Sequence, residues 1–183
     1  MIARETPDRR GAASCSLFSE LYNYSSRVRS RFVNKLAELP WEEVEKGREA
    51  SFQSIKNTLL HMIDNEDWIA NWVIFNRSAE YKRRDSAEYT NMQMIIGHLN
   101  EVQKKTSSYI KDIAEGEPKR RVKFTSSSGH TFDLSVEECL FQSFTEQLYH
   151  MGELIALLWQ SGVEPPRMQW FWNNPRQPEL RDV

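Results

Sequence analysis

Glu146 and His150 are the residues in this sequence with the clearest capacity for chemistry. They lie four positions apart in a segment with helical periodicity, so their side chains project from the same face of the expected helix. His61 lies in another expected helix, near the other end of the chain. A carboxylate and two imidazoles suit Zn²⁺, Ni²⁺, Fe²⁺ or Mn²⁺, and three protein ligands leave positions open for a reacting molecule. The three residues therefore suggest a catalytic metal site.

Each of these candidate ligands also has a purely structural interpretation. His61 and His150 could be hydrogen-bonded histidines at the edge of a core, and Glu146 could pair with a basic residue on the surface. Local periodicity does not decide between these interpretations, because it cannot show which helices face each other. His98, in a third expected helix, is a rival ligand that would complete a three-histidine set without Glu146.

Two further polar residues could orient the imidazoles. Asn65 lies one turn from His61, and Glu153 lies one turn from His150, so both are candidates for hydrogen bonds to the ligand rings. Cys139 lies within an apolar run and is expected to be a small core residue rather than a nucleophile.

Four long segments with helical periodicity are expected to position these residues, at 17–39, 51–75, 90–114 and 136–160. Between the third and fourth, residues 121–125 and 130–134 alternate polar and apolar side chains across a Ser/Gly turn, which predicts a β-hairpin. Ser135 and Glu138 then match the capping box that opens a helix.

The apolar positions of the first and last helices define the expected core faces. In the first helix the stripe comprises Leu17, Leu21, Tyr24, Val28, Phe32 and Leu36. The residues that fall mostly off this stripe are Arg27, Arg29, Arg31 and Lys35. In the last helix the expected core residues are Leu140, Phe141, Phe144, Leu148, Met151, Ile155, Leu158 and Trp159.

These patterns predict an all-α fold, a four-helix bundle with a small β-hairpin before the last helix. The bundle domain is expected at 15–166, after a mobile N-terminal tail at 1–14. The remaining residues, 167–183, form an aromatic C-terminal tail that contains Trp170, Phe171 and Trp172. Neighbouring aromatic residues rarely stay exposed, so this tail is expected to pack on the bundle or on a partner subunit.

Composition narrows the classes of function. The 183 residues include 24 basic and 26 acidic side chains, so no basic excess supports binding to nucleic acid. Although 39% of the residues are hydrophobic, no stretch approaches the ~20 apolar residues of a membrane span. The two cysteines, Cys15 and Cys139, lack metal or disulfide spacing and favour a reduced, cytoplasmic setting.

Two stretches of the sequence resemble the DinB/YfiT family of metalloenzymes. Residues 54–68 read SIKNTLLHMIDNEDW, which is similar to the family pattern of an early histidine followed by an acidic residue and tryptophan. Residues 150–166 read HMGELIALLWQSGVEPP, which is similar to the family's ending, a histidine-led helix that closes with Q-x-G-x-x-P-P.

The resemblance implies an up-down-down-up bundle, a homodimer and a divalent metal, often nickel or zinc. The implied ligands are a histidine of the second helix, which corresponds to His61, and a His-x-x-x-His pair on the fourth. His150 matches the last of these ligands, whereas the middle one falls on Glu146, where the family pattern has histidine. A carboxylate would make the site harder and more anionic.

Related proteins include S-transferases and isomerases that use low-molecular-weight thiols. The resemblance therefore implies a metal-dependent enzyme, a thiol transferase or a hydrolase, that acts on a small molecule. The alternative hypothesis is a non-catalytic bundle that serves as a binding or dimerisation module, in which Glu146 marks a decayed metal site.

Overall fold

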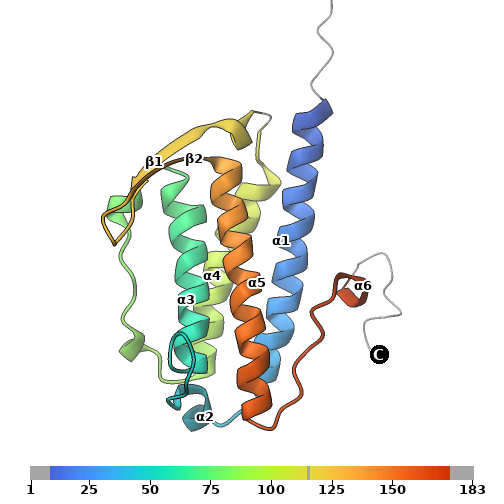
Figure 1. Cartoon of the computed structure of the whole chain (residues 1–183), viewed down its shortest axis with the longest axis vertical. Coiled ribbons are helices and arrows are strands. Elements are labelled where there is room, and N and C mark those ends of the chain that lie inside the picture. The colour runs from blue at the N-terminus through green and yellow to red at the C-terminus, as the bar shows by residue number, and fades with distance from the viewer. Residues whose placement is uncertain (1–8, 115, 174–183) are drawn as a thin grey trace, which may run out of the picture.

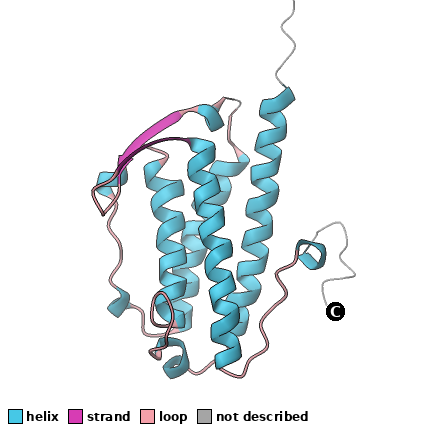
Figure 2. Cartoon of the chain, in the orientation of Figure 1, coloured by secondary structure: helices cyan, strands magenta, loops and turns pink. Residues whose placement is uncertain are grey.

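The structure is a computed structural model that describes residues 9–114 and 116–173. Four long helical segments dominate it, and Figures 1 and 2 show them lying side by side. They are α1 (Arg9–Leu36), α3 (Ile55–Asp67) with its π-helical continuation η1 (Trp68–Val73), α4 (Met92–Lys111) and α5 (Val136–Gln160). The short elements are α2 (Trp41–Glu45), η2 (Ser78–Glu80), η3 (Ser86–Glu88), η4 (Glu117–Lys119), β1 (Arg121–Thr125), β2 (Thr131–Ser135) and α6 (Trp170–Asn173).

Side-chain caps set where three of the long helices begin. Ser54 accepts a hydrogen bond from the Asn57 amide ahead of α3, and Asn91 accepts one from the Met94 amide ahead of α4. Ahead of α5, Ser135 and Glu138 form the predicted capping box, in which each side chain accepts from the backbone amide of the other. The caps satisfy amides that have no partner within the helix, so the helix starts are encoded locally.

The four helices enclose an apolar core that consists of two clusters of buried residues. α3 packs against α4 and α5, and α1 packs against the same two helices from the other side. Figure 1 shows α1 and α5 running in one direction, while α3 and α4 run in the opposite one. None of the described helices has the length and apolar content needed to cross a membrane.

The β-hairpin precedes α5 and lies at one end of the helices (Figure 1). Its antiparallel register pairs Arg121 with Ser135 and Thr125 with Thr131. The strands therefore match the predicted ones to within one residue. The prediction of a mostly helical chain with a small hairpin before the last long helix is confirmed.

Three residues assigned to the core by periodicity are exposed instead. Leu17 is 55% exposed, and in α5 Phe141 and Trp159 are 61% and 59% exposed. The periodicity was correct for helix formation, but Phe141 and Trp159 project from the side of α5 that has no neighbouring helix. Conversely, Arg29 was placed off the stripe of α1 and is only 3% exposed.

The ends of the chain differ in part from the expected domain limits. α1 begins at Arg9, so the last six residues of the expected N-terminal tail are helical, and residues 1–8 lie outside the described residues. At the other end, the Trp170 ring lies 5.1 Å from that of Tyr24, and Arg27 donates a hydrogen bond to the Asn173 carbonyl. The described part of the aromatic tail therefore contacts α1, while residues 174–183 lie outside the described residues.

Candidate metal centre

His61 of α3 meets Glu146 and His150 of α5 where these two helices pack together. One ligand atom from each of the three residues lies within 4.8 Å of the other two. Glu146 Oε2 lies 3.3 Å from His150 Nε2 and 3.5 Å from His61 Nε2. His150 is almost fully buried, whereas about a quarter of each of the other two side chains is exposed. The cluster is therefore anchored in the core and accessible from one side.

Two of the distances within this cluster suit a small divalent ion. A charge-assisted hydrogen bond between a carboxylate and an imidazolium is about 2.7–2.9 Å long, which is shorter than both separations. Ligand bonds of about 2.0–2.1 Å in a tetrahedral arrangement place neighbouring ligand atoms about 3.3–3.4 Å apart. The two separations between the carboxylate oxygen and the imidazole nitrogens therefore fit Zn²⁺ or a similar ion, while the separation between the two nitrogens is bounded only by the 4.8 Å extent of the cluster.

Glu153 holds the ring of His150 in place. Its Oε2 lies 3.0 Å from His150 Nδ1, and its Oε1 accepts a hydrogen bond of 2.6 Å from the Ser51 amide. Burial acts to raise the pKa of Glu153, but the contacts with His150 and Ser51 outweigh it, so the pKa is lowered. Donation from Nδ1 to this carboxylate leaves the Nε2 lone pair facing Glu146, as a metal ligand requires.

A loop before α3 covers the cluster with an aromatic ring. Phe52 stacks on His61 with ring centroids 4.0 Å apart and meets His150 edge-on at 5.3 Å. Arg48 secures this loop, because its backbone amide bonds to the Gln53 carbonyl and its Nη2 donates to Ser161 Oγ beyond α5. Burial lowers the pKa of His61, and the neighbouring His150 contributes to the lowering, while Glu146 acts in the opposite direction. A low pKa favours the neutral imidazole that binds metal.

Other candidates from the sequence lie elsewhere. Asn65 Oδ1 is buried and has no hydrogen-bond partner among the described residues, so this oxygen does not orient His61 as expected. His98 is separate from the cluster, and its Nδ1 lies 2.6 Å from the hydroxyl of Tyr89. Cys139 is buried as expected, and burial raises the pKa of its thiol to about 11, which makes it a poor nucleophile.

Three residues near the cluster were missed by the sequence-based interpretation. Gln142 donates a hydrogen bond of 2.9 Å to Glu146 Oε1, and its position one turn earlier in α5 could have indicated this contact. Phe52 and Ser51 fall within the segment predicted as helical at 51–75, but α3 begins only at Ile55, so both residues lie in the loop before it and helical spacing did not indicate their contacts.

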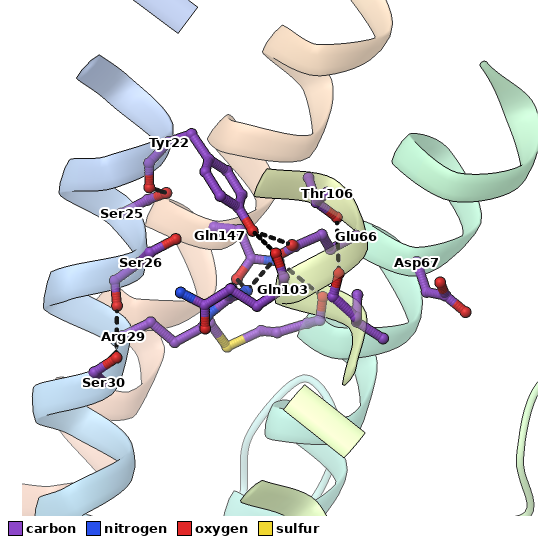
Figure 3. Close-up of polar contacts among 12 residues, drawn as sticks. Tyr22, Ser25, Ser26, Arg29, Ser30, Glu66, Asp67, Gln103, Thr106 and Gln147 are labelled. Atoms are coloured by element: carbon purple, nitrogen blue, oxygen red, sulfur yellow. Dashed lines mark hydrogen bonds and ion pairs between the residues drawn. The ribbon is translucent and has the colours of Figure 1, made fainter. Parts of the chain in front are cut away.

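A buried polar network lies beside the cluster, between α1, α3 and α5 (Figure 3). Arg29 Nη1 contacts Glu66 Oε2 at 2.5 Å and Gln147 Oε1 at 2.8 Å. Tyr22 donates a hydrogen bond of 2.9 Å to the other oxygen of Glu66, and Gln147 Nε2 donates one of 2.7 Å to the Met62 carbonyl. Because Met62 follows His61 and Gln147 follows Glu146, this last bond joins α3 and α5 next to the candidate ligands.

The fold and the site together define a helical protein whose packed helices present two histidines and a carboxylate that could hold a metal ion. The chain belongs to the DinB family, whose family model matches residues 12–180. Comparison with curated proteins gives no match.

Proposed function

We propose that this protein is a metal-dependent enzyme that holds a divalent ion between His61, Glu146 and His150. The observation that carries the proposal is the convergence of two imidazoles and one carboxylate, from two helices, within 4.8 Å. Partial exposure of His61 and Glu146 supports access by a small molecule. An open coordination position is the pattern of catalytic rather than structural metal sites.

A bound ion would lower the pKa of a coordinated thiol or water and so supply a nucleophile. The surrounding residues have separate tasks. Glu153 keeps Nε2 of His150 free to bind, and Gln142 restrains the carboxylate of Glu146. Phe52 covers one face of the His61 imidazole and contacts the His150 ring edge-on.

We infer that the reaction is transfer of a low-molecular-weight thiol to a small-molecule substrate, with hydrolysis as the alternative. Membership of the DinB family supports this inference, and the helix directions support an up-down-down-up bundle as the scaffold. A cytoplasmic setting, in which such thiols stay reduced, agrees with the unpaired thiol of Cys139.

Metal analysis tests the proposal directly. Protein prepared without an affinity tag and incubated with Zn²⁺ or Ni²⁺ is expected to retain about one ion per chain after gel filtration, as expected for a single three-ligand site. The His61→Ala/His150→Ala variant is expected to retain none, and the matched control, His130→Ala, changes an exposed histidine of the hairpin turn. Equal metal content in all three proteins would refute the site.

Activity assays of the metal-loaded protein, with and without a low-molecular-weight thiol, then distinguish the two reactions. Thiol transfer predicts that substrate is consumed only when a low-molecular-weight thiol is present, whereas hydrolysis proceeds without it. Full metal occupancy without either activity would favour a binding module.

We further infer that the protein is a homodimer that buries the exposed face of α5. Phe141, Tyr149 and Trp159 are 61%, 66% and 59% exposed and lie on one side of this helix. Large exposed aromatic residues on one helix face are typical of protein interfaces. Gly152 lies between them and has open space beside it, which permits close approach of a second helix.

Sedimentation analysis checks this interface. The Phe141→Lys/Trp159→Lys variant is expected to sediment as a monomer, because the interface would have to bury two charges. Phe171→Lys is the control, since Phe171 is 73% exposed but lies in α6. A dimer that survives the double substitution would place the contact on another face.

A further inference from the structure

A pocket adjoins the candidate metal centre and carries most of its charge on two arginines. It has a volume of about 540 Å³ and lies between the loop at 51–53, the start of α3 and residues 83–86. Arg83 and Arg84 line it together with Asp85, the one acidic residue among its lining residues. Pockets of this size accept small metabolites.

The loop at 51–53 forms part of both the pocket and the metal centre. Phe52 lines the pocket and stacks on His61 with centroids 4.0 Å apart. Asn57, which also lines the pocket, lies one turn before His61 on α3. A small molecule bound in the pocket would therefore lie beside the site where the reaction is proposed to occur.

The two arginines keep donors that their protein partners do not use. Arg83 contacts the mostly buried Asp64 through Nε at 2.5 Å. Arg84 contacts Glu101 through Nη2 at 2.6 Å and also interacts with the side chain of Tyr89. A guanidinium has five N–H donors, so each side chain retains several for a ligand. The contact with Asp64 also restrains Arg83, whose side chain is 56% exposed, at the pocket wall.

Neutral hydrogen-bonding groups complete the lining. The hydroxyl groups of Ser51 and Ser86 and the amides of Gln53 and Asn57 can donate to an oxyanion without adding charge. Arginines surrounded by such donors form the usual environment for a carboxylate or a phosphate, which a guanidinium can bind through two parallel hydrogen bonds.

We propose that this pocket binds the anionic group, a carboxylate or a phosphate, of the small molecule that reacts at the metal centre. The proposal rests on the proposed function for the identity of the neighbouring reaction, but the pocket binds anions with or without a metal. The substrate or the thiol cofactor of this enzyme is therefore an anionic compound.

Calorimetric titration of the full chain with inorganic phosphate and with succinate tests the pocket at low ionic strength. Binding of at least one anion is expected, and the stronger one identifies the group recognised. The Arg83→Gln/Arg84→Gln variant is expected to bind about tenfold more weakly, the order of effect of losing charge-assisted hydrogen bonds at a partly exposed site. The Arg77→Gln/Lys82→Gln variant removes the same charge from the same segment outside the pocket, and is expected to bind like the wild type.

Asp85→Asn provides a test that misfolding cannot imitate. This substitution removes the one acidic side chain of the lining. Asparagine can still accept the hydrogen bond that the Ala87 amide now donates to Asp85. It is expected to strengthen anion binding several-fold. If Arg83→Gln unfolds the protein, Arg83→Lys is the alternative variant, because it keeps a positive charge near Asp64. It is expected to weaken anion binding, since lysine cannot make the bidentate contact with the anion.

Three results would each refute anion binding by this pocket. They are no binding of either anion to the wild type, an equal loss of affinity in the control variant, and no gain of affinity in Asp85→Asn. Metal content, measured on the same samples, is expected to stay unchanged in all the pocket variants. Anion binding by a protein that holds no metal would refute the proposed function but leave the pocket in place, so the two failures are distinguishable.

Discussion

Replacing Glu66 with methionine is expected to destabilise the protein by about 3–5 kcal/mol, the cost of leaving a buried charge without its partner. Arg29 and Glu66 are 3% and 2% exposed, so water does not replace the lost carboxylate. Arg29 would retain Gln147 Oε1, a neutral acceptor. The reverse change, Arg29→Met, leaves the Glu66 carboxylate with Tyr22 as its remaining donor and is expected to cost a similar amount.

The double variant Arg29→Met/Glu66→Met is expected to recover most of the loss. Arg29 Nε is buried and has no hydrogen-bond partner in the part of the chain that the structure describes, so the pair does not fully offset the desolvation of its charges. Urea unfolding of the four proteins gives the coupling energy as a double-mutant cycle. The same cycle at Arg77 and Glu80, an ion pair with both side chains more than half exposed, is the control and should give little coupling.

Equal results for the buried and exposed cycles would contradict this account of the network. A large coupling would also bear on the metal centre. Through Gln147, the buried pair is connected to the bond between α5 and the Met62 carbonyl, which lies next to His61 and Glu146. Metal affinity measured on the same variants would reveal whether the network holds the ligands in position.

The parts of the fold that depend on nearby residues were predictable. The capping box of Ser135 and Glu138, the hairpin and the four long helical segments are all encoded within a few residues of where they occur. Burial of Arg29 was not predictable, because it depends on Glu66, a partner on another helix. The π-helical turn after Asp67 was also missed, since the apolar pattern continues through it.

The residues of the candidate site also fall into those that local sequence predicted and those that it did not. Helical spacing placed Glu146 and His150 on one face, but only the resemblance to a family indicated that His61 would face them. One-turn spacing suggested both Glu153 and Asn65 as supporting residues. Glu153 contacts His150, whereas Asn65 Oδ1 has no hydrogen-bond partner within residues 9–114 and 116–173, because spacing gives the helix face but not the side-chain direction. Phe52 and Arg83 lie in loops of the structure, and the helical periodicity assigned to 51–75 did not indicate the contacts of Phe52.

If the proposed metal site is correct, Glu146 is the residue expected to determine which ion binds. It is the one anionic side chain of the ligand cluster, and its Oε2 lies between the Nε2 atoms of the two histidines, 3.3 Å and 3.5 Å away. Glu146→Gln keeps the shape of the side chain but removes the charge. We expect it to lower metal affinity by more than about 100-fold, because loss of a partner that only orients a ligand already costs 10–100-fold.

Glu146→His is expected to have a different effect, since it restores a nitrogen ligand where the family pattern has histidine. Three neutral imidazoles favour Zn²⁺ and Ni²⁺ over Mn²⁺, which prefers oxygen ligands, so the ratio of Zn²⁺ to Mn²⁺ affinity should rise. Competition titrations with a chelating indicator measure both variants, and Glu164→Gln, at an exposed position beyond α5, is the control. Unchanged affinity in Glu146→Gln would remove Glu146 from the ligand set, and His98 would not replace it, because His98 does not belong to the cluster of candidate ligands. If the ratio of Zn²⁺ to Mn²⁺ affinity rises in Glu146→His but not in Glu146→Gln, a single side chain accounts for the difference in metal preference between this protein and the family pattern.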